Sequence, residues 1–221
     1  MLRGIFVTGT DTNAGKTVAC AALLHRYRGG VRLRYWKPVQ TGIEQDDDTS
    51  EVRRLAAVSD EEIFDDGVRL PRPVSPHLAA RLAGRPIAIQ KLTARIRPQP
   101  DDLRWIVEGA GGALVPLNET ELMTDLMRAL ALPVLVVARS SLGTINHTLL
   151  TVEALRRRDL DVAGVLMVGE KNLENRAAIE HYGGIPVLGE MPVLAPLDAA
   201  RLSAWACAEL DSRNRLRELL P

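Results

Sequence analysis

The chain begins with a short apolar strand, a glycine-rich turn and the start of a helix. Residues 4–7 are Gly-Ile-Phe-Val, residues 8–14 form the turn, and Gly15-Lys16-Thr17 precedes an apolar helical run. Backbone N–H groups of such a turn, together with the helix N-terminus, converge on an anionic phosphate. A lysine followed by a threonine at this place suits the outer phosphates and a magnesium ion. The segment therefore predicts a nucleoside triphosphate site of the P-loop type.

The spacing of this P-loop is unusual, because the turn between Gly9 and Gly15 is one residue longer than the common pattern. A helix that begins with Gly-Lys-Thr by chance is the alternative interpretation. The preceding strand and the apolar run over residues 18–24 favour the P-loop. The nucleotide-binding residues predicted from this loop are Thr12, Asn13, Ala14, Gly15, Lys16, Thr17 and Val18.

The rest of the chain alternates apolar strand-like runs with helical patterns, and its 221 residues fit one α/β domain over residues 1–221. Residues 132–137 are apolar on both alternating faces, which is typical of a parallel strand covered by helices on both sides. We therefore expect a P-loop NTPase-type three-layer sandwich with a mostly parallel central sheet. The pattern predicts strands near 3–8, 31–36, 103–108, 133–138, 162–168 and 185–189. It predicts helices over 16–28, 50–57, 75–83, 87–96, 121–130, 145–157, 173–181 and 197–217, and surface loops over 44–50 and 68–75.

Composition excludes several classes of partner. The formal net charge is zero, so no broad basic field indicates a nucleic acid or an anionic membrane as partner. No apolar stretch is long enough to span a bilayer, and no signal peptide is visible. Cys20 and Cys207 lie far apart and have no metal-like spacing, so we expect free thiols in a cytoplasmic protein.

Ligands of parallel sheets bind at the carboxyl ends of the strands, so the residues after each strand are the candidates for function. The strand near 31–36 should stop at Lys37, because Pro38 cannot donate to a sheet ladder. Lys37 would then neutralise charge on a transferring phosphoryl group, or it is a solvated strand-end lysine. Asp46, Asp47 and Asp48 follow; an acidic run is usually solvated, but beside a nucleotide one of its carboxylates often holds Mg²⁺.

Two further strand ends are unusual. Residues 103–108 end in Glu108 and continue as Gly-Ala-Gly-Gly, which permits a close approach of backbone to ligand. A carboxylate in this place often holds Mg²⁺ in P-loop proteins. Residues 141–148 enter a helix with small polar side chains, which suits an anion such as a carboxylate or reflects ordinary capping by Thr144 or Asn146.

Taken together, these segments resemble dethiobiotin synthetase, an ATP-dependent enzyme family of biotin synthesis. The combination of Gly-Thr-Asp-Thr, Lys-Pro-Val-Gln-Thr-Gly, Val-Glu-Gly-Ala-Gly-Gly and Leu-Gly-Thr-Ile-Asn-His is specific, whereas the P-loop alone indicates a large superfamily. The resembling stretches are Val7 to Thr17, Lys37 to Gly42, Ser75 to His77, Val107 to Gly112, Leu142 to Thr151 and Gly189 to Pro192.

The resemblance implies a homodimeric cytoplasmic enzyme that closes a ureido ring on 7,8-diaminononanoate with CO₂, ATP and Mg²⁺. Lys16 and Lys37 would be catalytic and offset charge on the phosphates and on a carbamate. By the family pattern the metal ligands are Thr17, Asp48 and Glu108. The substrate-binding residues are Thr12, Lys37, Thr41, Gly111 and Gly112, together with Gly143, Thr144 and Asn146 of the other subunit, which receive the substrate carboxylate.

The chain departs from this family in one place. The family often carries an Asn-Asp pair after the strand near 162–168, and the Asn reads adenine, but here Val168 is followed by Gly169. A valine offers no bidentate amide contact to a base, so other triphosphates become candidate substrates. Backbone groups near Pro192, Val193 and Leu194 remain as candidate contacts to the base.

Two other classes of P-loop protein compete with this interpretation. Partner-regulated ATPases of the partition or iron-protein type carry a lysine where this chain has Asp11. Amide-forming ligases of the cobyrinate group carry a glutaminase domain with a nucleophilic cysteine, and this chain is too short for one. A non-enzymatic nucleotide-binding module would leave Lys37 and the glycine-rich segment after Glu108 without a purpose.

Overall fold

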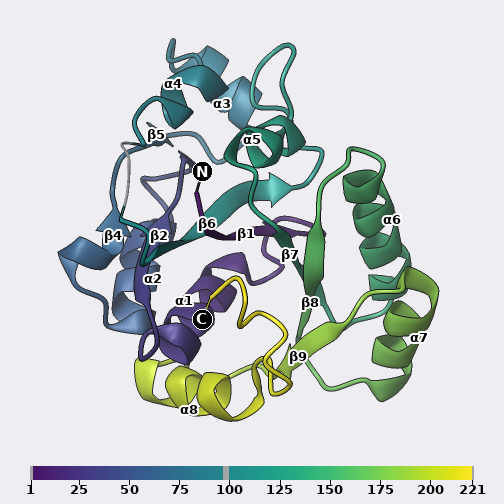
Figure 1. The fold of residues 1–221 in the computed structure, drawn as a ribbon. Coiled ribbons are helices and arrows are strands. Elements are labelled where there is room, and N and C mark those ends of the chain that lie inside the picture. The colour runs from purple at the N-terminus through teal and green to yellow at the C-terminus, as the bar shows by residue number, and fades with distance from the viewer. Residues whose placement is uncertain (1, 97–99, 221) are drawn as a thin grey trace.

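A computed structural model describes residues 2–96 and 100–220, and the remaining residues of the predicted domain lie outside this description. The described residues form a central seven-stranded sheet in the order β4-β2-β6-β1-β7-β8-β9, in which each adjacent pair runs parallel. Figure 1 shows helices on both sides of this sheet, so the expected three-layer α/β sandwich is confirmed. The strands are β1 (Gly4–Gly9), β2 (Arg32–Trp36), β4 (Ile63–Phe64), β6 (Leu103–Gly112), β7 (Val134–Arg139), β8 (Val162–Val168) and β9 (Val187–Met191).

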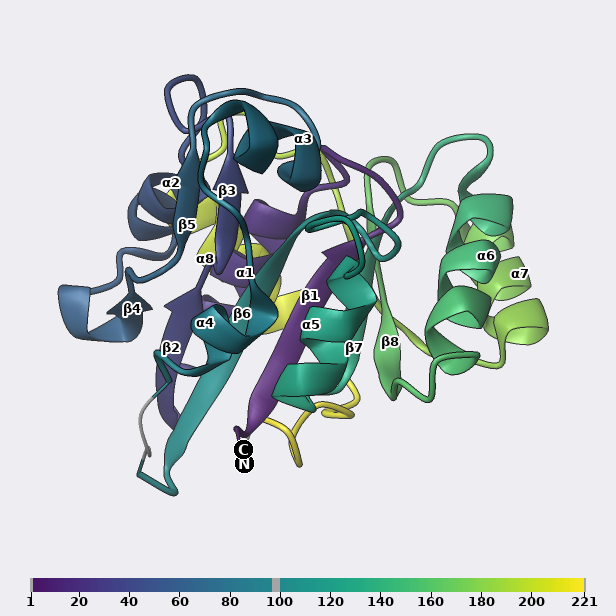
Figure 2. The same cartoon turned by 90° about the horizontal axis from the view of Figure 1, so that it is seen from above.

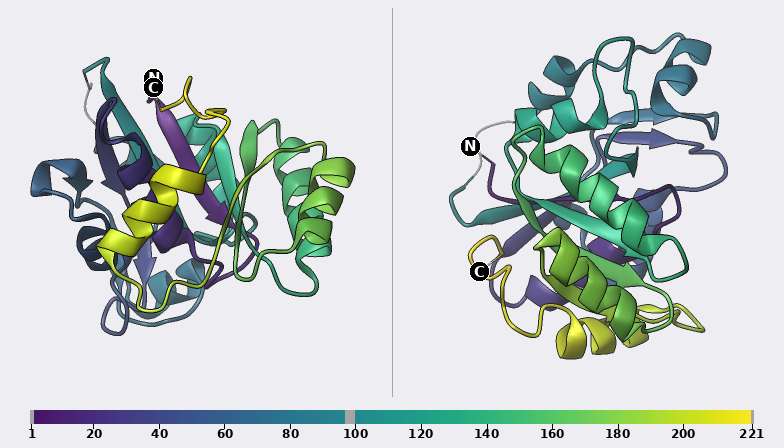
Figure 3. Two further views of the ribbon diagram at one scale, coloured as in Figure 1. Left: turned by 90° about the horizontal axis from the view of Figure 1, so that it is seen from below. Right: turned by 90° about the vertical axis from the view of Figure 1, so that its right-hand side faces the viewer.

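Side chains that alternate along the strands feed two hydrophobic cores, one on each face of the sheet. Phe6 and Val107 point into one core, whereas Ile5 and Ile106 point into the other. Helices α1 (Lys16–Tyr27), α2 (Asp48–Ala56) and α8 (Ala199–Glu209) cover one face, and Figure 3 shows α8 alongside α1. The other face is covered by α3 (Pro76–Leu82), α4 (Ile89–Thr93), α5 (Met123–Leu130), α6 (Thr144–Arg156) and α7 (Leu173–Gly183).

The expected surface loop over 68–75 is wrong for its first residues. Strand β5 (Val68–Leu70) pairs in parallel with β3 (Val39–Thr41) as a separate two-stranded sheet, and Figure 2 shows the two strands side by side. Leu70 is fully buried. The prolines in residues 71–76 suggested a loop, but backbone partners from a distant segment outweigh a local preference in this place.

Other boundaries also differ from the expectations. The predicted helix over 197–217 ends at Glu209, because Asp211 adopts a left-handed backbone conformation (φ 47°) and accepts hydrogen bonds from the backbone N–H groups of Arg215 and Leu216. Helix α2 begins at Asp48, inside the segment predicted as a loop. Strand β6 continues past Glu108 to Gly112 through a register shift against β1, so the glycines bulge at the end of the strand.

The expected end of β2 is confirmed, since the strand stops at Trp36, directly before Lys37 and Pro38. Both cysteines are free, as expected. Within the described part of the chain, no helix has both the length and the apolar character needed to cross a membrane.

Candidate active site

The P-loop connects β1 to α1 at the carboxyl edge of the sheet. Gly15 precedes the helix with φ 98°, a left-handed conformation that a side chain would strain, and a Cβ there would lie 3.2 Å from Cγ2 of Val168. The ammonium of Lys16 donates to the backbone carbonyl of Asp11 at 3.1 Å, which holds the side chain along the loop. Burial, and then the nearby charge of Lys37, lower the pKa of Lys16.

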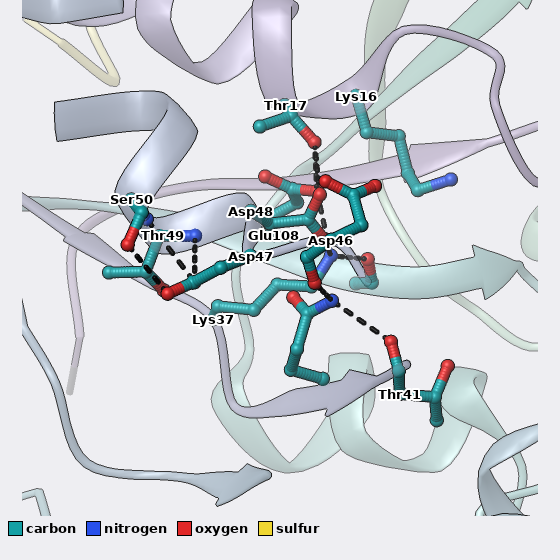
Figure 4. Close-up of polar contacts among 12 residues, drawn as sticks. Lys16, Thr17, Lys37, Thr41, Asp46, Asp47, Asp48, Thr49, Ser50 and Glu108 are labelled. Carbon is teal, nitrogen blue, oxygen red and sulfur yellow. Dashed lines mark hydrogen bonds and ion pairs between the residues drawn. The ribbon is translucent and has the colours of Figure 1, made fainter. Parts of the chain in front are cut away.

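Four side chains from four elements meet beside this loop, as Figure 4 shows. Thr17 lies in the first turn of α1, Lys37 directly after β2, Asp48 at the start of α2 and Glu108 in β6. The Lys37 Nζ atom lies 2.5 Å from Oδ2 of Asp48 and 2.7 Å from Oε1 of Glu108. The Thr17 Oγ1 atom lies 2.8 Å from Oδ1 of Asp48 and 3.0 Å from Oε1 of Glu108. We call these four residues the carboxylate cluster.

Lys37 and Asp48 stabilise each other's charged forms. Burial alone would lower the pKa of Lys37, but the carboxylates of Glu108 and Asp48 outweigh burial and raise this pKa above its ordinary value. Burial would raise the pKa of Asp48, but the charge of Lys37 and its hydrogen bond lower this pKa instead. A cationic Lys37 at this position suits the neutralisation of negative charge.

The three consecutive aspartates have different partners in the structure. Asp47 accepts hydrogen bonds from the backbone N–H groups of Thr49 and Ser50 and caps α2. Asp46 is exposed. Asp48 alone among the three belongs to the carboxylate cluster, because its oxygens contact Thr17 and Lys37.

The oxygens of Thr17, Asp48 and Glu108 fit a magnesium ion. One hydroxyl and two carboxylates are hard ligands, and Mg²⁺ usually completes such a set with waters and phosphate oxygens. The described residues contain no group of three or more His, Cys, Asp and Glu side chains around one point, and the third protein oxygen here comes from a threonine.

The carboxylate cluster and the P-loop together line a pocket of about 250 Å³, which we call the phosphate pocket. The pocket joins most of the predicted phosphate, metal and substrate residues, although they lie up to about a hundred positions apart in the sequence. Ala14 is buried and does not line it. The lining residues are Thr12, Asn13, Gly15, Lys16, Thr17, Val18, Lys37, Thr41, Asp48, Glu108, Ala110 and Gly111.

The remaining predicted substrate residues lie outside this pocket. Thr144 lines a neighbouring hollow of about 360 Å³ with Asp11 and Arg139, whereas Gly143 and Asn146 are exposed at the start of α6. Gly112 lines a third hollow, of about 320 Å³, together with Thr12. Thr12 thus borders both the phosphate pocket and the hollow beside α6.

The candidate contacts to the base also lie outside the phosphate pocket. Pro192, Val193 and Leu194 follow β9, Val193 is 77% exposed, and none of the three lines that pocket. Val168, at the end of β8, packs against Gly15 of the P-loop.

Sequence reasoning missed three residues around the site. Tyr35 is fully buried and donates to Oε2 of Glu108 at 2.8 Å, and burial followed by the charge of Glu108 raises its pKa. Its position two residues before Lys37, on the same face of β2, was the available signal. Cys20 lies on the buried side of α1 near Glu108, and burial raises the pKa of its thiol. Arg139, the last residue of β7, donates a hydrogen bond of 2.9 Å to the backbone carbonyl of Thr12.

Comparisons with solved structures concern the fold. A ParA family ATPase from Chlorobium tepidum aligns with 93% of this chain and 98% of its own, with a TM-score of 0.56 and 9% identity. The MinC:MinD cell division complex of Aquifex aeolicus gives a TM-score of 0.57 at 12% identity, over 92% of this chain and 86% of that one. At such identities the likeness concerns the fold alone, so it does not support a partner-regulated ATPase.

Comparisons of sequence are more specific. A family model described as an AAA domain matches residues 3–201. The ATP-dependent dethiobiotin synthetase BioD of Brucella ovis is 44% identical over 90% of this chain and 90% of its own length. The bifunctional biotin biosynthesis protein BioCD of Bordetella avium is 45% identical over 92% of this chain, which spans 42% of that protein. BioD of Paramagnetospirillum magneticum is 48% identical over 91% of this chain and 94% of its own length, and the chain therefore belongs to the ATP-dependent dethiobiotin synthetase family.

Proposed function

We propose that this protein converts 7,8-diaminononanoate, CO₂ and ATP into dethiobiotin, ADP and phosphate with the help of Mg²⁺. The observation that carries the proposal is the carboxylate cluster beside the P-loop, in a chain that is 48% identical to a dethiobiotin synthetase. The cluster offers oxygen ligands for a metal and a buried cation within one pocket, and phosphoryl transfer depends mainly on such positioning and charge neutralisation.

The proposed reaction has three steps. One amine of the substrate captures CO₂ as a carbamate and loses a proton. A carbamate oxygen then attacks the γ-phosphorus, which forms a carbamic–phosphoric anhydride and releases ADP. The second amine attacks the activated carbonyl carbon, closes the ring, and expels phosphate and a proton.

The residues of this chain would serve the second step most directly. The backbone N–H groups of the P-loop and the ammonium of Lys16 bind the phosphates of ATP. Lys37 stabilises the negative charge that the carbamate oxygen and the transferring group share. Thr17, Asp48 and Glu108 would hold Mg²⁺, which supplies further positive charge at the β- and γ-phosphates. Thr12 and Thr41 orient the diamine or the carbamate.

Base recognition is the part of the proposal that depends on a departure from the family pattern. Val168 packs against Gly15 and presents no hydrogen-bonding side chain to a nucleobase. We therefore propose that backbone groups of Pro192, Val193 and Leu194 supply the base contacts and that CTP and GTP also support the reaction.

The exposed start of α6 supports a shared site in a homodimer. Gly143 and Asn146 lie outside the phosphate pocket, and their exposed backbone suits a carboxylate presented by a second copy. Leu114 and Leu150, at 47% and 56% exposure, line the hollow next to Thr12, where a second copy would cover them. The two free cysteines support a cytoplasmic location.

The shared site has a direct test by complementation. Lys37→Gln and Asn146→Ala should each impair turnover alone, while a mixture of the two variants after subunit exchange should regain activity, because mixed dimers contain one intact site. Sedimentation of the mixture as a dimer without any recovery of activity would contradict a site shared between subunits.

The activity itself is tested by phosphate release from ATP with Mg²⁺ and bicarbonate, with and without 7,8-diaminononanoate, together with mass spectrometry of the product. We expect phosphate release that depends on the diamine and a product that gains one carbonyl group. Phosphate release that is indifferent to the diamine would overturn the proposal, and parallel reactions with CTP and GTP test the base contacts.

A further inference from the structure

The phenol of Tyr35 is buried directly beside the carboxylate cluster. Tyr35 lies on β2, has no solvent exposure, and donates its hydroxyl proton to Oε2 of Glu108 at 2.8 Å. Strand β2 pairs with β6, and Tyr35 is aligned with Ile106, two residues before Glu108. The phenol is therefore fixed by the same pair of strands that carries the carboxylate.

The two oxygens of Glu108 have different kinds of partner. Oε2 accepts from Tyr35, whereas Oε1 lies 2.7 Å from Nζ of Lys37 and 3.0 Å from Oγ1 of Thr17. Only Oε1 faces groups that line the phosphate pocket. The tyrosine thus occupies the oxygen that points into the core and leaves the other one for the pocket.

This division of partners matters because the terminal torsion of a glutamate is broad and has no strong intrinsic preference. Lys37 and Thr17 have further proposed roles, toward the carbamate and the metal, and these roles require them to exchange contacts with Glu108 for contacts with ligands. The phenol has no proposed role toward the carbamate, the metal or the nucleotide, so the proposed reaction does not require its hydrogen bond to change. A hydrogen bond from a fixed phenol restricts this torsion and so favours one plane of the carboxylate.

We propose that Tyr35 is a positioning residue that orients Glu108 so that Oε1 ligates the divalent cation. The inference rests on the proposed metal role of Glu108. Hydrogen-bond partners of metal ligands commonly contribute about 10- to 100-fold to metal affinity.

The chain provides a matched control in Tyr27. Its hydroxyl also donates to a buried carboxylate, Oδ2 of Asp211, at 2.6 Å, and its side chain is 7% exposed. Asp211 does not line the phosphate pocket. Tyr27→Phe and Tyr35→Phe therefore remove the same kind of hydrogen bond, one remote from the metal ligands and one next to them.

The experiment measures Mn²⁺ binding by electron paramagnetic resonance in the presence of ADP, together with ADP binding in EDTA and the thermal midpoint. We expect Tyr35→Phe to weaken Mn²⁺ binding about 10-fold or more, to leave ADP binding in EDTA within about twofold of the parent, and to remain folded. Tyr27→Phe should lower the thermal midpoint about as much as Tyr35→Phe does, and it should leave Mn²⁺ binding unchanged.

Unchanged Mn²⁺ binding in Tyr35→Phe would overturn the inference, and so would an equal loss of ADP binding in EDTA, which indicates a general effect on the fold. Glu108→Gln separates this failure from failure of the proposed metal site. If Glu108→Gln loses Mn²⁺ binding and Tyr35→Phe does not, only the positioning role is wrong. If Glu108→Gln binds Mn²⁺ normally, Glu108 is not a ligand.

Discussion

Two buried carboxylates in this molecule each accept a hydrogen bond from a tyrosine. Comparing them distinguishes a carboxylate of the candidate active site from one that stabilises the fold. Glu108 accepts from Tyr35, and Asp211 accepts from Tyr27. Glu108 has no solvent exposure and Asp211 is 1% exposed. Burial and a tyrosine partner therefore do not distinguish the two.

The other partners do. Asp211 accepts its remaining hydrogen bonds from the backbone N–H groups of Arg215 and Leu216, at 2.8 Å each, and these donors are fixed by the turn that follows α8. Glu108 instead meets the side chains of Lys37 and Thr17 at the wall of a pocket. A carboxylate whose donors are backbone N–H groups stabilises the fold and keeps those partners. A carboxylate whose partners are side chains can exchange these contacts for contacts with a ligand.

The largest expected effect concerns Lys37, the cation of the carboxylate cluster. Lys37→Gln should reduce turnover by about 1000-fold or more, because a buried positive charge at the transferring group is lost. Circular dichroism should show an intact fold. Lys171→Gln is the control, since Lys171 pairs with Glu209 at a half-exposed position and should leave turnover unchanged. Normal turnover in Lys37→Gln would remove Lys37 from the proposed mechanism.

Asp47 and Asp48 provide the next test, because backbone donors hold Asp47 and side chains hold Asp48. Asp48→Asn should raise the Mg²⁺ concentration needed for half-maximal activity about 10-fold or more, since a charged candidate ligand is lost. Asp47→Ala removes a helix cap held by backbone donors and should cost about 1 kcal/mol of unfolding free energy without changing the Mg²⁺ requirement. The reverse pattern would exchange the two assignments.

Asp211→Asn should act on stability alone. One oxygen of Asp211 becomes a donor facing donors, so denaturant unfolding should show a loss of about 3 kcal/mol. ADP and Mn²⁺ binding should match those of the parent, because the phosphate pocket does not include Asp211. Weakened Mn²⁺ binding in a folded Asp211→Asn protein would show that the two regions are coupled.

The last expected effect is a dependence of the free energy of unfolding on alkaline pH. Burial, and then the hydrogen bond to Asp211, raise the pKa of Tyr27 above its ordinary value of 10.0. Above pH 10 the unfolded chain therefore loses a proton that the folded protein retains, so stability is complete below this pH and falls as the pH rises. Tyr27→Phe should reduce this slope by about 1.4 kcal/mol per pH unit. An identical slope in the variant would show that Tyr27 ionises within the fold.

Local pattern was sufficient where a segment carries its own structural cause. The P-loop was predictable because Gly15, Lys16 and Thr17 are consecutive and follow an apolar strand. The end of β2 was predictable because Pro38 lacks a donor. The helix predicted over 197–217 failed for the opposite reason, since Asp211 stops helical structure through contacts with Tyr27 and with the turn itself. Strand β5 failed likewise, because its partner β3 lies about 30 residues away.

The sequence by itself determined the three-layer class, the phosphate-binding loop and the candidate residues at the strand ends, because apolar periodicity and motif spacing are local properties. Tertiary structure decided which of three aspartates faces Thr17, that Lys37 joins Asp48 to Glu108, and that Tyr35 holds the second oxygen of Glu108. These contacts join β2, α2, β6 and α1, and spacing along one element does not say which other elements lie beside it. Burial then gives them their strength, because water no longer competes for the charges.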